Sequence, residues 1–198
     1  CWRLGDGLMP LGAAKAAFLG AAGTVAAAGD FEYIAGTTFD GSTATHTFSA
    51  IPQTYNSLKL LMYFKGDSSP FRPTIRMNGD TNTVYSTVNC YAAAGTSGFN
   101  GSTTVSADKI ELPLTPIAST DMYAEAYVGA YTSTTVCSPV LFQWGSCDSS
   151  TSQMPFCTGA GALRDGTAAI TSITILCSNG NDAASGSTIQ VFGYKDAA

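Results

Sequence analysis

Two stretches near the C-terminus, AAITSITIL at residues 168–176 and GSTIQVFGYK at residues 186–195, decide the fold of this chain. Both largely alternate an apolar side chain with Thr, Ser or Gln, and this period of two buries one face of a strand while the other meets water. The polar loop NGND at residues 179–182 separates them. Two alternating segments joined by turn-forming residues predict a scaffold built from sheets.

Upstream of these stretches, short apolar and aromatic segments alternate with turn signals, and no helix–strand rhythm is present. We expect strands over residues 31–35, 44–48, 58–64, 74–77, 84–91, 109–112, 122–128 and 140–144. Loops are expected over residues 92–106 and 145–158, and Asn78-Gly79 predicts a hairpin-type turn. This spacing predicts an all-β, jelly-roll-like antiparallel β-sandwich, with an Ig-like sandwich as the alternative.

The N-terminal segment has a different composition, because Ala, Gly and Leu dominate residues 9–29. A secretory signal and a transmembrane helix are two interpretations, but four glycines and Lys15 do not suit a membrane-spanning helix. The third interpretation is a short helix over roughly residues 11–19, inside an arm of small side chains. We favour it, and the domains are then an arm over residues 1–30 and a β-sandwich over residues 31–198.

An arm of this kind cannot form a core of its own, so it requires a partner surface. Its larger side chains, Leu11, Lys15, Phe18 and Leu19, are the predicted assembly residues. We therefore expect a homo-oligomer or a contact with another protein.

Composition and charge exclude several classes of function. The chain of 198 residues has only 12% charged residues and a net charge of -5, with no basic cluster. A phosphate backbone or an anionic membrane surface would repel such a protein, so we expect no nucleic-acid partner and no membrane insertion. Solubility has to come from Ser, Thr, Asn and Gly, which suits an extracellular or particle-bound β protein.

Six cysteines are present, and none forms a C-x-x-C pair. Cys137, Cys147 and Cys157 recur every ten residues in a Ser/Thr-rich region. They are either small buried residues or partners in disulfides formed in an oxidising medium. His46 is the only histidine, so a Cys/His zinc site with local spacing is not expected, and we predict no metal and no cofactor.

Catalytic signatures are sparse. His46 lies in an alternating run and is interpreted as a residue on a strand face, and no nucleophile motif accompanies it. Glu111 and Glu125 fall on separate expected strands and would have to meet in space to form a glycosidase pair. We therefore expect a protein that is not an enzyme.

Aromatic residues near the longest expected loop suggest a binding surface instead. Tyr91, Phe99 and Asn100 form a possible surface-binding loop, where exposed rings would stack on sugars. The alternative is that these aromatic residues pin the loop to the sheet.

Several segments, in order along the chain, resemble the small virion structural proteins of tailed phages, especially those of aquatic hosts. They are PLGAAKAAFLGAAG (10–23), IPQTY (51–55) with LKL (58–60), IRMNGD (75–80), AAITSITI (168–175) and the strand at 186–195. This sequence departs from the group in its lead-in, residues 1–8, and in its number of cysteines.

The resemblance implies a phage virion structural protein on the extracellular particle surface, such as a head decoration (cement) or head-fibre protein anchored by the arm. It implies a homo-oligomer, a trimer by analogy, and contacts with other virion proteins such as the major capsid protein. The alternative is a receptor- or glycan-binding tip of a tail fibre, or a secreted lectin-like module, with a host surface glycan as partner. A surface depolymerase is a third, enzymatic hypothesis.

Overall fold

The computed structural model describes residues 31–65, 72–92, 99–112, 121–147, 155–164, 168–177 and 181–195. These residues form strands and contain no helix, and every strand pair is antiparallel. The strands are β1 (Phe31–Thr38), β2 (Thr45–Phe48), β3 (Ser57–Phe64), β4 (Pro73–Met77), β5 (Tyr85–Ala92), β6 (Phe99–Ala107), β7 (Ile110–Glu111), β8 (Asp121–Gly129), β9 (Pro139–Cys147), β10 (Phe156–Leu163), β11 (Ile173–Cys177) and β12 (Thr188–Tyr194).

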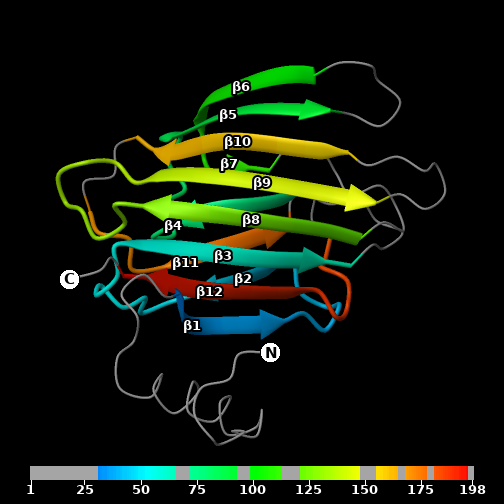
Figure 1. Ribbon diagram of the computed structural model, residues 1–198, viewed down its shortest axis with the longest axis horizontal. Coiled ribbons are helices and arrows are strands. Elements are labelled where there is room, and N and C mark those ends of the chain that lie inside the picture. Colours follow the sequence, from blue (N-terminus) through cyan, green and yellow to red (C-terminus); the bar gives the residue numbers. More distant parts are fainter. Residues whose placement is uncertain are drawn as a thin grey trace, which may run out of the picture.

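Two sheets form two layers. The larger sheet has eight strands in the order β1-β12-β3-β8-β9-β10-β5-β6, and the smaller has four in the order β2-β11-β4-β7. Figure 1 shows the smaller sheet lying behind the larger one. The predicted all-β, antiparallel sandwich is therefore confirmed for the described residues.

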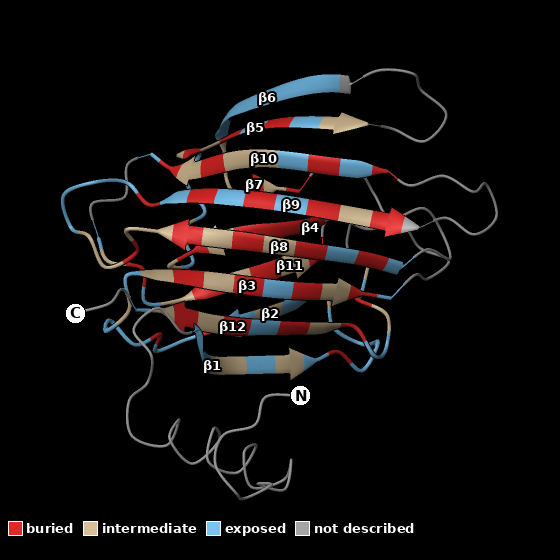
Figure 2. Ribbon diagram, viewed as in Figure 1, coloured by how far each residue is buried: buried red, intermediate tan, exposed pale blue. Residues whose placement is uncertain are grey.

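The core lies between the two layers. Leu58 and Leu60 of β3 and Ile75 and Met77 of β4 are all fully buried, and they belong to one hydrophobic cluster. Alternate residues of β3 and β8 are buried, as Figure 2 shows by the change of colour along each arrow. Strands such as β3 and β8 thus turn one set of side chains to the core and the other set to an outer face, the face of the larger sheet away from the smaller sheet.

The prediction of a loop over residues 92–106 is wrong. Most of these residues form β6, which pairs with β5 at the edge of the larger sheet. Ser, Thr and Gly dominate this strand, and its described side chains are mostly exposed. Such an edge strand buries little on either face, so it carries no apolar alternation to detect.

The predicted bounds of the second loop, residues 145–158, are also wrong at both ends. β9 continues to Cys147, and β10 begins at Phe156. β10 was missed because its sequence FCTGAGAL is rich in small residues with low strand propensity. Tertiary packing overrides that preference: a Cβ at Gly161 would lie 2.8 Å from an Ile110 side-chain carbon, so the close approach needs glycine.

Asn78 and Gly79 do form a turn with positive φ angles of 51° and 65°. The turn joins β4 to β5, which belong to different sheets, so the expected hairpin is wrong. The Asn78 side chain accepts hydrogen bonds from the backbone N–H groups of Thr171 and Ser172, at 2.8 and 3.2 Å. These bonds hold the approach to β11, which begins at Ile173 rather than at the expected Ala168.

The N-terminal arm, residues 1–30, lies outside the described residues. The helix expected there, and the assembly residues Leu11, Lys15, Phe18 and Leu19, therefore stay predictions.

Tyr85 links the two sheets, and its loss should weaken the sandwich. Its buried hydroxyl donates to the carbonyl of Met77 at 3.0 Å and accepts from the Met77 N–H at 2.9 Å. Burial raises the pKa of Tyr85, so the hydroxyl keeps its proton. We expect Tyr85→Phe to lower the free energy of unfolding by about 1–3 kcal/mol in urea denaturation, since both backbone groups lose a partner.

The matched control is Tyr123→Phe, which removes the same atom from a side chain that is 65% exposed. Its free energy of unfolding should stay within about 0.5 kcal/mol of the wild type. Equal losses in the two variants would contradict the linking role of Tyr85.

Candidate functional site

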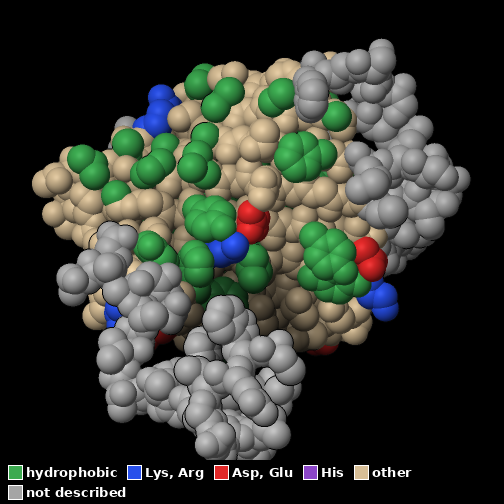
Figure 3. All heavy atoms as spheres, in the orientation of Figure 1, with side chains coloured by type: hydrophobic (Ala, Val, Ile, Leu, Met, Phe, Trp, Pro, Cys, Tyr) green, Lys and Arg blue, Asp and Glu red, His purple; other side chains and the backbone are tan. Residues whose placement is uncertain are grey.

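The outer face of the larger sheet is unusually apolar. Nine large apolar side chains are exposed in the described residues, and all but Val136 lie on this face. The eight are Phe31, Tyr33, Leu61, Val88, Val105, Tyr123, Leu141 and Phe156. Figure 3 shows hydrophobic side chains spread over this face. Because soluble monomers seldom expose a large contiguous apolar patch, this face is the candidate functional surface.

Strand register arranges part of this surface as a row across the strands. Tyr33 pairs with Phe192, and Tyr127 pairs with Leu141. Lys59 lies between the two pairs, opposite both Phe192 and Tyr127. We name Tyr33, Phe192, Tyr127, Leu141 and Val88 the apolar row.

Lys59 adds no uncompensated charge to the apolar row. Its ammonium lies 4.8 Å from the ring centroid of Tyr127 and 5.5 Å from that of Phe31. It also forms an ion pair with Glu125 at 2.8 Å, and the hydrogen bond to Glu125 raises the pKa of Lys59. Its charge is thus compensated within the sheet.

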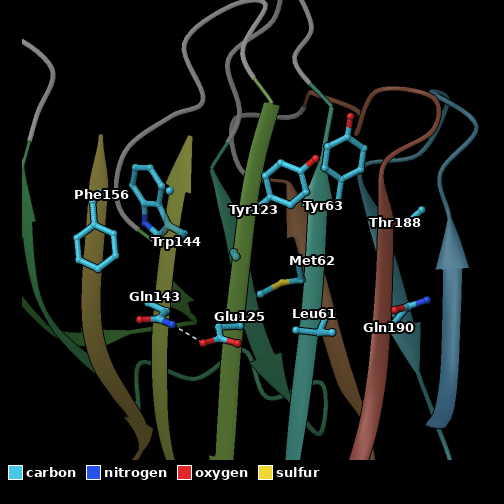
Figure 4. A pocket seen from close by; sticks show the side chains of 12 residues that line it. Leu61, Met62, Tyr63, Tyr123, Glu125, Gln143, Trp144, Phe156, Thr188 and Gln190 are labelled. Carbon is cyan, nitrogen blue, oxygen red and sulfur yellow. Dashed lines mark hydrogen bonds between the residues drawn. The ribbon is translucent and has the colours of Figure 1, made fainter. Parts of the chain in front are cut away.

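A groove of about 540 Å³ lies on the same face, near the N-terminal end of β8. Tyr63, Tyr123, Gly145 and Phe156 line one side of it. Register places these four residues in one line across β3, β8, β9 and β10. Figure 4 shows the Tyr63 and Tyr123 rings side by side, with Phe156 on the far strand.

Gly145 opens a slot within that line, because it has no side chain between Tyr123 and Phe156. Of the residues that the structure describes, a Cβ built at Gly145 would meet only Pro155, whose carbonyl oxygen would lie 3.7 Å away, an ordinary contact. We name Tyr123, Gly145 and Phe156 the aromatic slot.

Tyr63 supports one wall of this slot. Its ring centroid lies 4.9 Å from that of Tyr123, with an interplanar angle of 36°. Its hydroxyl donates to Asp121 at 2.7 Å, and this hydrogen bond raises the pKa of Tyr63 to about 12. The Tyr63 hydroxyl therefore keeps its proton and its hydrogen bond to Asp121 at neutral pH, which holds the Tyr63 ring beside Tyr123.

The adjacent line across the sheet carries Gln190, Leu61, Glu125 and Gln143, so three of its four side chains are polar. Gln143 donates a hydrogen bond to Glu125, drawn as a dashed line in Figure 4, and Gln190 is exposed on β12. The hydrogen bond from Lys59 is the main cause that lowers the pKa of Glu125. Glu125 is thus an ionised, compensated carboxylate and an acceptor for hydrogen bonds rather than a proton donor.

The residues expected in a surface-binding loop lie elsewhere. Tyr91 is half-buried on β5 and packs against the core, and it is opposite Asn100 on β6. Phe99 also belongs to β6, but its side chain lies outside the described part. The structure therefore brings Tyr91 and Asn100 into register on a strand pair, not into a loop.

The cysteines expected in disulfides are separated. Cys137 is exposed with a free thiol, while Cys157 is buried with a free thiol on β10. Cys147 ends β9, and its side chain is outside the described part. Among the described side chains, a Cys137–Cys157 disulfide is absent, whereas any bond of Cys147 stays a prediction.

Residues considered for chemistry do not converge. His46 lies on β2 as predicted, and burial lowers its pKa. Glu111 is on β7 of the smaller sheet, whereas Glu125 faces outward from the larger sheet. Within the described residues, no three His, Cys, Asp or Glu side chains gather where they could hold a metal ion. Nor does this part of the chain contain a helix long and apolar enough to cross a membrane.

Sequence reasoning missed the groove, although one signal was available. Tyr63 and Tyr123 lie in the expected strands at residues 58–64 and 122–128. In MYAEAYV (122–128), the larger residues Tyr123, Glu125 and Tyr127 share one face, and the small or apolar residues share the other. That alternation identifies an outer face with aromatic side chains.

Comparison with protein-family models finds no match, and comparison with curated proteins finds none either. A crystal structure of a protein of unknown function from Shewanella oneidensis MR-1 is similar over 98% of each chain, with 12% sequence identity and a TM-score of 0.26. A score this low leaves fold and function to be argued from the chain itself.

Burial should divide the cysteines by reactivity. It raises the pKa of Cys157 to about 11 and that of Cys177 to about 12, so both stay protonated thiols at pH 8. We expect iodoacetamide to modify Cys90 and Cys137 in the folded protein, and Cys157 and Cys177 only after denaturation, as read by peptide mass spectrometry. A peptide linking Cys137 to Cys157 before reduction would contradict this assignment.

Proposed function

We propose that this chain is a structural protein of a phage virion, displayed on the particle surface as a head decoration (cement) or head-fibre protein. The observation that carries the proposal is the outer face, on which eight large apolar side chains are exposed. An apolar face of this kind is typical of a surface that another protein covers in an assembly. The low charge of the chain fits the same role, because few charged residues oppose burial against a neighbour.

Strand order supports a jelly roll as the finer description of the fold. Eight strands, β1, β2, β3, β4, β7, β8, β11 and β12, form two sets of four, one set in each sheet. Counted along the chain, one set has the order first, eighth, third and sixth, and the other the order second, seventh, fourth and fifth. This is the arrangement of two Greek keys in a jelly roll, an architecture of viral capsid and lectin domains. β9, β10, β5 and β6 then extend one sheet.

A second copy of the chain is the proposed cover of the apolar row. The row is almost uncharged, since Lys59 is neutralised within the sheet by Glu125 and by aromatic rings. A neighbouring copy would therefore meet apolar side chains on this row rather than an uncompensated charge. A trimer is the proposed closed form, by analogy with the phage proteins that the sequence resembles.

The arm, residues 1–30, is proposed as the attachment to other virion proteins such as the major capsid protein. It joins β1 at Phe31, which lies on the outer face beside Tyr194, with ring centroids 5.2 Å apart. The attachment would thus start at the edge of the surface that the copies share.

The groove favours one alternative, a receptor- or glycan-binding tip of a tail fibre or a secreted lectin-like module. Exposed Tyr123 and Phe156 beside Glu125 and Gln143 are the observation behind it. Both roles place the chain outside the cell.

A charged substitution in the apolar row should dissociate the proposed oligomer into single chains. Leu141 is 59% exposed on the outer face, and Val136 is 53% exposed in the connection before β9. By light scattering we expect the full chain to have a multiple of its 20.4 kDa mass, and Leu141→Asp to have the mass of one chain. Val136→Asp, the matched control, should keep the oligomer. A monomeric wild-type chain would refute the assembly.

Particle location tests the virion role directly. We expect antibodies against the β-sandwich to label intact heads in electron micrographs of particles purified from cultures that carry the gene. Particles made without the gene provide the control. Labelling confined to tail tips would favour the alternative, and labelling of cells without particles would refute the virion proposal.

A further inference from the structure

We propose that the aromatic slot is a carbohydrate-binding site for a neutral pyranose ring, with Tyr123 and Phe156 as its walls and Gly145 as its floor. This inference does not depend on the virion proposal, and it names the ligand class for the groove behind the glycan-binding alternative. It rests on the two exposed aromatic side chains beside Gly145, on the polar line next to them and on the compensated charge of the groove.

Strand geometry sets the spacing of the two aromatic residues. Tyr123 on β8 and Phe156 on β10 are separated by β9, so their backbones lie two strand spacings apart, about 10 Å. Figure 4 shows the two rings on either side of β9. The C–H faces of a pyranose present a flat apolar surface that stacks on an aromatic ring at about 4.5 Å or more between centroids, so a sugar between the two strands can reach either ring.

The floor has to be empty for a ring to enter. Gly145 leaves that space: within the described part of the chain, a Cβ there would contact only the Pro155 carbonyl oxygen, at 3.7 Å. A larger residue would fit the strand but would occupy the slot. The volume of the whole groove, about 540 Å³, is in the range of small-ligand sites, about 300–1,000 Å³.

Polar groups lie where sugar hydroxyls would need them. Glu125 and Gln143 are two residues along their strands from the slot, about 7 Å away on the same face. After its bond to Glu125, the Gln143 carboxamide keeps an acceptor oxygen and a second N–H. Planar carboxamide and carboxylate groups beside aromatic faces match a ligand with one apolar face and hydroxyls at its rim.

The charge of the groove selects a neutral ligand. Among the described residues, its lining contains the carboxylate of Glu125 and no Lys or Arg, and Lys59 is already paired with that carboxylate at 2.8 Å. An anionic ligand would gain no cation there. Neutral hexoses are thus preferred over sialic acid, uronic acids or phosphate.

The slot and the apolar row do not compete for the same surface. Tyr123 and Tyr127 are four residues apart on β8, about 13 Å along the strand. A second copy could cover the row while a sugar occupies the slot.

The test uses the full chain with methyl glycosides of glucose, galactose and mannose, in saturation-transfer NMR and titration calorimetry. We expect at least one of them to bind the wild type. Gly145→Val should weaken binding at least tenfold, because its side chain fills the slot while its β-branched form suits a strand. Phe156→Leu, which keeps an apolar side chain and removes the aromatic face, should weaken binding about fivefold or more.

Gly101→Val is the matched control. Gly101 lies on the outer face at β6, and a Cβ there would meet only the Asn89 carbonyl oxygen, at 3.8 Å. It should bind sugar as the wild type does. The inference is overturned if no glycoside binds the wild type, or if Gly145→Val binds as tightly as Gly101→Val.

Light scattering of the same variants separates this inference from the virion proposal. We expect Gly145→Val to keep the native mass of the wild type. Dissociation of Gly145→Val would show that the groove is a subunit contact, which overturns the sugar site. Sugar binding by a wild-type monomer would instead support the site while removing the proposed assembly.

Discussion

The close packing of β10 is the constraint on which the larger sheet depends. β10 lies between β9 and β5 in the larger sheet. It can pack there because Gly159 and Gly161 leave room for neighbouring side chains. A Cβ at Gly159 would lie 2.4 Å from the Phe142 ring, and one at Gly161 would lie 2.8 Å from Ile110 of the smaller sheet. With side chains at these positions, β10 could not lie flat against its neighbours, and the β5–β6 pair would lose its place in the sheet.

The width of the sheet creates the functional surface. The larger sheet has eight strands against four in the smaller one, so its outer face is wider than the smaller sheet. Phe156 is the far wall of the slot and lies on β10, while Leu141 and Val88 continue the apolar row on β9 and β5. The glycines that let β10 pack inward therefore also determine what the outer face can present.

The sequence allowed prediction of the elements that have two-faced patterns. β3, β8, β11 and β12 alternate clearly, because one face enters the core. β3, β8 and β12 were expected within two residues of their observed bounds, whereas β11 begins five residues later than expected. β6 and β10 were not expected, since one is an exposed edge strand and the other owes its glycines to tertiary contacts. The groove was missed for a related reason: its residues meet only through register, which pairs Tyr63 with Tyr123 and Gly145 with Phe156.

Register also explains how one face could serve two kinds of contact. Side chains two residues apart along a strand share a face, so each line across the outer face has its own chemistry. One line carries aromatic rings, the next carries Glu125 and Gln143, and the third is the apolar row. The ion pair of Glu125 with Lys59 crosses from the second line to the third, which neutralises the row and leaves the polar line an acceptor. An apolar contact and a polar, aromatic one can thus lie side by side without either exposing an uncompensated charge to the other.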